Sequence, residues 1–100
     1  MIRGTTPTHM FMLPFEVALV KEIRILYAQK EKVLFTKETA DCVMEGNMVS
    51  VTLTQEDTFK FDCKNHIQIQ LRVLTTDGQV LSTPIKYVDV GTCLDSEVIA

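Results

Sequence analysis

The side chains that could do chemistry are few and are spread along the chain. His9 and His66 are the candidate general bases, and Cys42, Cys63 and Cys93 are the candidate thiol nucleophiles. Nucleophilic catalysis needs a hydroxyl or thiol beside a positioned base, and both histidines fall within alternating segments typical of strands. The sequence therefore predicts no catalytic residues, and we expect the protein not to be an enzyme.

Two pairs of reactive groups deserve a closer test. Cys63 precedes His66 by three residues, and a hydrolase using this pair remains an alternative, although such spacing arises readily by chance. Glu56 and Asp57 are adjacent carboxylates, but neighbouring side chains point apart. Thr54 with Asp57 three residues later instead resembles a capping box, which satisfies free amides at the start of a helical turn.

Composition argues against several classes of ligand. The cysteines are odd in number and contain no C-x-x-C pair, so we expect reduced thiols and no metal site. The four glycines stand singly, which gives no phosphate-binding loop and no nucleotide cofactor. With a net charge of −3 and scattered basic residues, nucleic acid is not an expected partner. Neither is a membrane, because the longest aliphatic run, residues 17–20, is far shorter than the ~20 residues of a membrane span.

Alternating apolar and polar residues predict β-strands along most of the chain. The expected strands are residues 8–13, 21–27, a segment carrying Val33 and Phe35, 41–44, 48–53, 66–74, 79–82 and a last strand after Pro84. Polar turns are expected at residues 29–31 and 45–47, and Asp77-Gly78 predicts a two-residue hairpin loop. A change of apolar parity between Tyr87 and Val88 predicts a bulge or bend in the last strand.

This spacing of strands and turns is typical of an all-β fold. We expect an antiparallel, immunoglobulin-like β-sandwich of about seven strands with at most a short helical turn, around residues 16–21. At 100 residues the chain suits one domain, 1–100, with an N-terminal arm at 1–7 and a tail at 94–100 that is either flexible or packed on a neighbouring subunit.

Large apolar side chains on the polar faces of strands require an explanation. Met10 and Met12 alternate with Phe11 and so face away from it, and Met48 and Leu74 add further apolar groups near strand ends. One explanation is that a loop or the tail covers them. The other is that Met10, Met12, Met48 and Leu74 belong to a partner interface.

A resemblance adds to these patterns. The segments 3–8 with Phe11 and 13–15, then 46–58, then 67–78, resemble small structural proteins encoded in prophages of Gram-positive bacteria. The second half is also similar to the β-sandwich N-terminal domain of phage baseplate upper proteins, in which a strand, an L-T-x-E-D-T-like turn, a long strand and a D-G hairpin recur. Neither resemblance supplies catalytic or cofactor-binding residues.

The resemblance implies a phage or prophage virion structural protein without enzymatic activity. Such a protein docks into a capsid, connector or tail/baseplate assembly through strand edges and the N-terminal arm. Its partners would be other phage structural proteins or copies of itself, first in the bacterial host cytoplasm and then in the virion. The alternative is a small-ligand or carbohydrate-binding β-sandwich module that uses Tyr27, Tyr87 and nearby polar residues as a shallow site.

Overall fold

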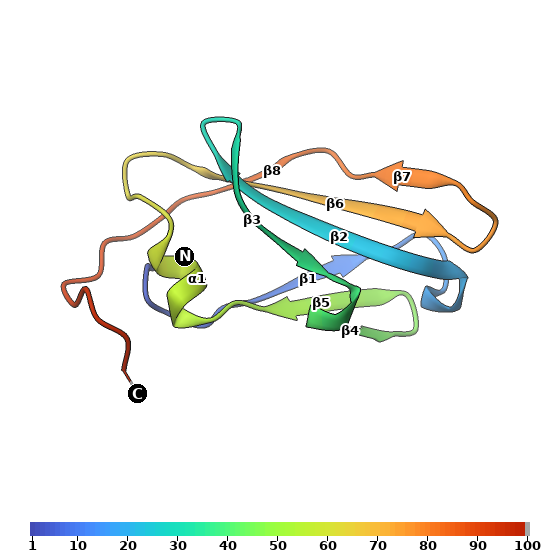
Figure 1. Ribbon diagram of the computed structural model, residues 1–100, viewed down its shortest axis with the longest axis horizontal. Helices are drawn as coiled ribbons and strands as arrows, with labels where there is room; N and C mark the ends of the chain where they lie inside the picture. Colours follow the sequence, from blue (N-terminus) through green and yellow to red (C-terminus); the bar gives the residue numbers. More distant parts are fainter. Residues whose placement is uncertain (100) are drawn as a thin grey trace.

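The computed structural model describes residues 1–99, which form two antiparallel sheets packed face to face with one short helix (Figure 1). The strands are β1 (Thr8–Met12), β2 (Val20–Gln29), β3 (Lys32–Glu38), β4 (Cys42–Glu45), β5 (Met48–Thr52), β6 (Ile67–Thr75), β7 (Val80–Ser82) and β8 (Lys86–Val88). The small sheet has the order β1-β5-β4. The large sheet has the order β3-β2-β6, and both β7 and β8 pair with the free side of β6. The expected β-sandwich architecture is consistent with this two-sheet arrangement.

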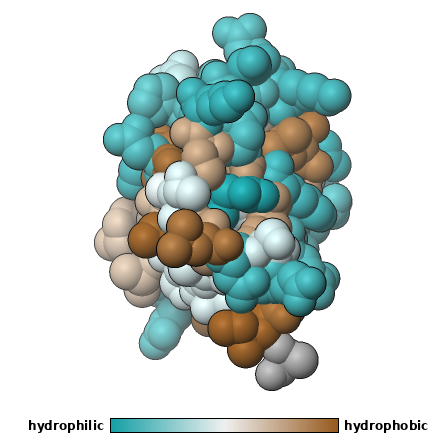
Figure 2. All heavy atoms as spheres, turned by 90° about the vertical axis from the view of Figure 1, so that its left-hand side faces the viewer, coloured by the Kyte–Doolittle hydropathy of each residue, from teal (hydrophilic) through white to brown (hydrophobic). Residues whose placement is uncertain are grey.

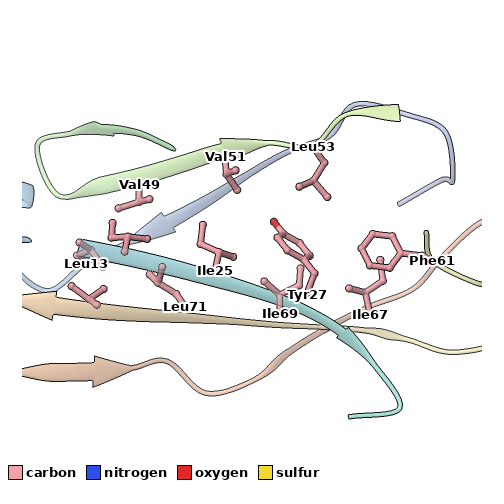
Figure 3. Close-up of a cluster of buried hydrophobic side chains, with 12 residues drawn as sticks. Leu13, Ile25, Tyr27, Val49, Val51, Leu53, Phe61, Ile67, Ile69 and Leu71 are labelled. Atoms are coloured by element: carbon pink, nitrogen blue, oxygen red, sulfur yellow. The ribbon is translucent and has the colours of Figure 1, made fainter. Parts of the chain in front are cut away.

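The core lies between the two sheets and follows from the period-two alternation of the strands (Figure 3). β2 and β6 contribute every second residue from the large sheet, and β5 faces them from the small sheet. The buried cluster consists of Leu13, Ile23, Ile25, Tyr27, Val49, Val51, Leu53, Phe61, Ile67, Ile69, Leu71 and Val73. Tyr27 is the largest fully buried side chain and stacks on Phe35 with ring centroids 4.9 Å apart.

The helix α1 (Gln55–Phe59) confirms the capping box. The Asp57 amide donates to the Thr54 hydroxyl over 3.1 Å, and the Thr54 amide donates to the Asp57 carboxylate over 2.9 Å. The same carboxylate lies 2.7 Å from the Lys37 ammonium group on β3. Burial alone would raise the pKa of Asp57, but Lys37 and Thr54 together outweigh it and hold the pKa below its ordinary value. This contact ties α1, which follows the small sheet, to an edge of the large sheet.

The short turns confirm most of the sequence expectations. β2 and β3 are joined through Lys30 and Glu31, which both adopt positive φ as a tight hairpin turn requires. Gly46 has φ +62° between β4 and β5. The expected helical turn at residues 16–21 is a 3₁₀ turn over Val17–Leu19, and a second 3₁₀ turn covers Thr39–Asp41. Among residues 1–99, no helix has the length and apolar character needed to cross a membrane.

The β6–β7 hairpin differs from the expected two-residue loop. Leu74 pairs with Val80, and the Thr75 amide donates to the Gln79 carbonyl over 2.8 Å, so residues 76–78 form a three-residue loop. Gly78 closes it with φ +88° and donates its amide to the Thr75 carbonyl. A three-residue loop of this kind needs a left-handed residue at its last position, and glycine takes that conformation without strain.

The expected irregularity in the last strand occurs earlier than its apolar pattern indicated. The register with β6 is continuous from Lys86 to Val88, including Tyr87. The break instead lies between β7 and β8, where three residues, 83–85, face two on β6. Pro84 has no amide to give to the ladder, which explains why the strand is interrupted there. Because β7 and β8 occupy one edge in succession, the eight strands fill seven positions.

Both ends of the described chain lie at one end of the elongated molecule, on the left of Figure 1. The arm is ordered, because Arg3 donates its amide to the Gly91 carbonyl and the Met1 amino group donates to the Asp89 carbonyl. The tail is held at Ile99 by two hydrogen bonds to the Gln55 side chain. Residue 100 of the expected tail lies outside the described residues. Figure 2 views this end, where a few hydrophobic groups lie within a largely hydrophilic surface.

Replacing Asp57 should destabilise the fold markedly. D57A removes the helix cap and leaves the Lys37 ammonium group largely buried without its partner, so we expect the free energy of unfolding to fall by about 3 kcal/mol. E56A changes the exposed carboxylate next to it and should cost less than about 0.5 kcal/mol. Urea unfolding followed by circular dichroism measures both, and equal effects of the two substitutions would show that the cap and ion pair contribute nothing.

Candidate interaction surface

The outer face of the small sheet carries exposed apolar side chains from two of its three strands. Met10 and Met12 are 62% and 69% exposed on β1, and Val43 is 67% exposed on β4. Met48 lies between these strands on β5 and is half-buried. We call this surface the Met face; it consists of Thr8, Met10, Met12, Val43, Glu45, Met48, Ser50 and Thr52.

The strand register arranges the Met face in rows. Met12 pairs with Met48, which in turn pairs with Glu45. One row further along, Met10 pairs with Ser50, and Ser50 pairs with Val43. Directly paired side chains on one face of a sheet lie ~5 Å apart, so the methionines form one continuous patch.

This patch has the physical character of a contact surface. Methionine side chains are flexible and polarisable, and they adapt to the shape of an opposing surface at low energetic cost. The described tail does not supply a cover, since its last hydrogen bonds join Ile99 to α1 rather than to the Met face. Because Met10 and Met12 are both more than half exposed, neither the tail nor a loop within residues 1–99 covers them.

The four residues expected at the interface do not form a single surface. Met10, Met12 and Met48 lie together on the Met face, whereas Leu74 lies on the outer face of the large sheet beside Glu22 and Val80. The two outer faces point in opposite directions because the core separates them. Val43 was not singled out from the sequence, although the inward positions of Cys42 and Met44 imply that it points outward.

His9 lies on the inward face of the small sheet, and its ring forms a hydrogen bond to Tyr27 of the large sheet. Its Nδ1 atom lies 2.8 Å from the Tyr27 hydroxyl, and the two rings are stacked with centroids 5.7 Å apart. Burial, followed by the charges of Lys86 and the N-terminal amino group, lowers the pKa of His9, and burial is also the main cause that raises the pKa of Tyr27. The pair is a hydrogen bond that joins the two sheets, and the lowered pKa of His9 favours its neutral form.

The other reactive groups lie apart from the Met face. Asp57 is engaged as the cap and ion pair described above. His66 Nδ1 lies 2.6 Å from Asp89 Oδ1, with both side chains exposed. Cys63 is half-buried. Within residues 1–99, no group of three or more His, Cys, Asp or Glu side chains is placed to hold a metal ion.

The shallow ligand site expected around Tyr27 and Tyr87 does not exist as a surface. Tyr27 is fully buried, whereas Tyr87 is 62% exposed on β8. Tyr27 lies on the inward face of β2 with Ile23 and Ile25, and a residue on that face has no access to a ligand in solvent. Of the two aromatic residues on which the carbohydrate-binding alternative depends, Tyr27 is therefore unavailable to a ligand and Tyr87 is exposed.

Comparison of the chain with protein-family models, with curated proteins and with solved structures gave no match. The function is therefore inferred from the geometry of the described residues and from the resemblance given above.

The His9–Tyr27 bond should make stability depend on pH. Because the pKa of folded His9 lies below that of the unfolded chain, near 6.5, the unfolded chain binds more protons as pH falls through this value. The free energy of unfolding should then decrease on acidification below about pH 6.5, by at most ~1.4 kcal/mol per pH unit. Urea unfolding between about pH 5 and 7.5 measures this slope.

The second histidine provides the control for this measurement. H66Q should keep the acid-dependent loss of stability, since His66 is exposed, whereas H9Q should lose most of it. If H66Q removed the slope and H9Q left it, the acid sensitivity would belong to the exposed histidine and the interpretation of the buried bond would be wrong.

Proposed function

We propose that this chain is a non-enzymatic structural protein of a phage or prophage virion that docks into a capsid, connector or tail/baseplate assembly through protein–protein contacts. The observation that carries the proposal is the Met face, with Met10, Met12 and Val43 each more than half exposed on one sheet. A patch of exposed apolar side chains on a small folded domain is typical of a surface that another protein covers. The resemblance of segments 46–58 and 67–78 to phage proteins supports the same role.

We further propose that the strand arrangement is immunoglobulin-like. In that fold one sheet has the order A-B-E-D, and the other contains G, F and C, with C′ added in variable-type domains. What supports the assignment is the order β1-β5-β4, which corresponds to B-E-D, and the order β3-β2-β6 followed by β7 and β8, which corresponds to C′-C-F-G. In this assignment no described strand occupies the position of A, beside the outer edge of β1.

The proposed partners are other phage structural proteins or further copies of this chain, met first in the bacterial host cytoplasm and then in the virion. The N-terminal arm was expected to contribute to docking. Its backbone groups at Met1 and Arg3 are already bonded to residues 89–91 of the same chain, so we place the contact on the Met face.

Removing the apolar side chains of the Met face should abolish assembly without unfolding the protein. The double variant M10S/M12S changes two exposed positions, so its free energy of unfolding should stay within about 1 kcal/mol of the wild type. Its matched control is L74S/V80S, which changes two paired apolar residues on the outer face of the other sheet. Loss of the protein from particles in M10S/M12S alone would support the Met face, whereas loss in the control alone would place the contact around Leu74.

The assembly role itself is tested by fractionating particles. After induction of the source prophage, full particles, free heads and free tails are separated on a gradient, and each fraction is searched for this chain by mass spectrometry. We expect many copies in one of the three fractions. Absence of the chain from all three would contradict a virion structural role.

A further inference from the structure

β1 is an open sheet edge, and its hydrogen-bonding groups can be assigned residue by residue. Leu53 donates its amide to the Pro7 carbonyl over 2.9 Å, and Leu13 donates to the Asn47 carbonyl over 2.7 Å. In an antiparallel ladder the bonds recur at every second residue, so the backbone groups of His9 and Phe11 also point toward β5. The N–H and C=O groups of Thr8, Met10 and Met12 therefore point outward, away from the sheet.

The other edges of the two sheets are protected in the ways that prevent strand pairing. β3 carries Lys32, Lys37 and Glu38, and β4 ends at Glu45 after only four residues. The edge formed by β7 and β8 is bulged at Pro84 and contains Lys86.

β1 is also short, but it lacks the charges, the bulge and the proline that protect the other edges. Its five residues contain no charge and no proline, and its register with β5 is unbroken from Thr8 to Met12. Among the edges formed by residues 1–99, it is the one equipped to accept another strand.

We propose that this edge pairs with β1 of a second copy of the chain. The proposal rests on the proposed function only for its choice of partner, because further copies of this chain are among the partners proposed above. Antiparallel pairing about a two-fold axis at Met10 would place Met10 opposite Met10 of the second copy, and Thr8 opposite its Met12. Each copy then fills, for the other, the position of the missing strand A. The two small sheets join into one, and the two Met faces become continuous.

Charge favours a second copy as the occupant. In a two-fold pairing centred on Met10, Met10 faces itself and Thr8 faces Met12, so a strand without charges can pair with its own copy without placing a charge opposite a like charge on the axis. β1 carries no charge. The outward N–H and C=O groups of Thr8, Met10 and Met12 supply both hydrogen-bond donors and acceptors, so each copy can satisfy those of the other.

A charge-swap experiment tests the self-pairing and its register together. M10K and M10E each place like charges opposite one another on the axis, so each should raise the dissociation constant of the dimer at least about tenfold. An equimolar mixture of M10K and M10E should restore the dimer, since opposite charges then meet. Sedimentation equilibrium on the purified 100-residue chain over a range of concentrations measures the dimer fraction.

Val43 supplies the matched control. It lies in the same row and on the same face as Met10, is similarly exposed, and belongs to the opposite edge strand. V43K should leave the dissociation constant within about twofold of the wild-type value. A wild-type chain that stays monomeric overturns the proposal, as does an M10K variant that dimerises like the wild type or a dimer lost only in V43K.

Hydrogen exchange on the wild-type chain gives a test that needs no variant. The amides of Met10 and Met12 should exchange rapidly at low concentration and become protected as dimers form, whereas the Phe11 amide should be protected throughout. Unchanged exchange at Met10 and Met12 in a dimeric sample would overturn pairing through β1.

Failure of this inference and failure of the proposed function give different results. A monomeric chain that is nevertheless found in particles would overturn the self-pairing and leave a different virion protein as the occupant of the edge. A dimer absent from every particle fraction would keep the pairing and contradict the virion role.

Discussion

The hydroxyl of Tyr27 must find a hydrogen-bond partner inside the core, and much of the structure depends on how it does so. The ring is fully buried between the sheets, where an unpaired hydroxyl would cost about 1–3 kcal/mol. His9 meets this need from the small sheet, with Nδ1 2.8 Å from the hydroxyl. Because His9 must point inward, the alternation of a strand obliges Met10 to point outward. The polar contact in the core and the apolar patch on the surface thus both follow from the alternation of side chains along β1.

The same division applies to the whole molecule. Several polar side chains hold the two layers and their loops in place. Lys37 and Asp57 connect β3 to α1, and the buried Gln29 side chain bonds to the backbone of Asp62 and Asn65, which fixes the loop before β6. The small sheet, by contrast, presents a backbone edge and exposed methionines, a combination suited to recognition by shape and strand pairing.

Features set by neighbours in sequence could be predicted, and features set by contacts between distant segments could not. The alternation of residues 66–74 identified the inward face of β6, and Thr54 with Asp57 identified the start of α1, because both signals act within a few residues. The length of the β6–β7 loop depends on whether Thr75 joins the ladder, which is decided by its pairing with Gln79. The separation of Leu74 from the Met face likewise required knowing which sheet each strand joins. The interface itself and the role in a virion remain predictions from the sequence.

The arm's attachment to residues 89–91 affects the order in which the fold can form. The Met1 amino group bonds to a carbonyl 88 residues away, and a ribosome releases the amino terminus first. β1 and β5 can meet once residue 52 has emerged, whereas the arm must wait until residues 89–91 have emerged. The outer edge of β1 is open during this interval, as it is in the folded chain, and is then accessible to another nascent chain on the same polysome. The proposed pairing between neighbouring copies can therefore begin during synthesis, before either domain has closed.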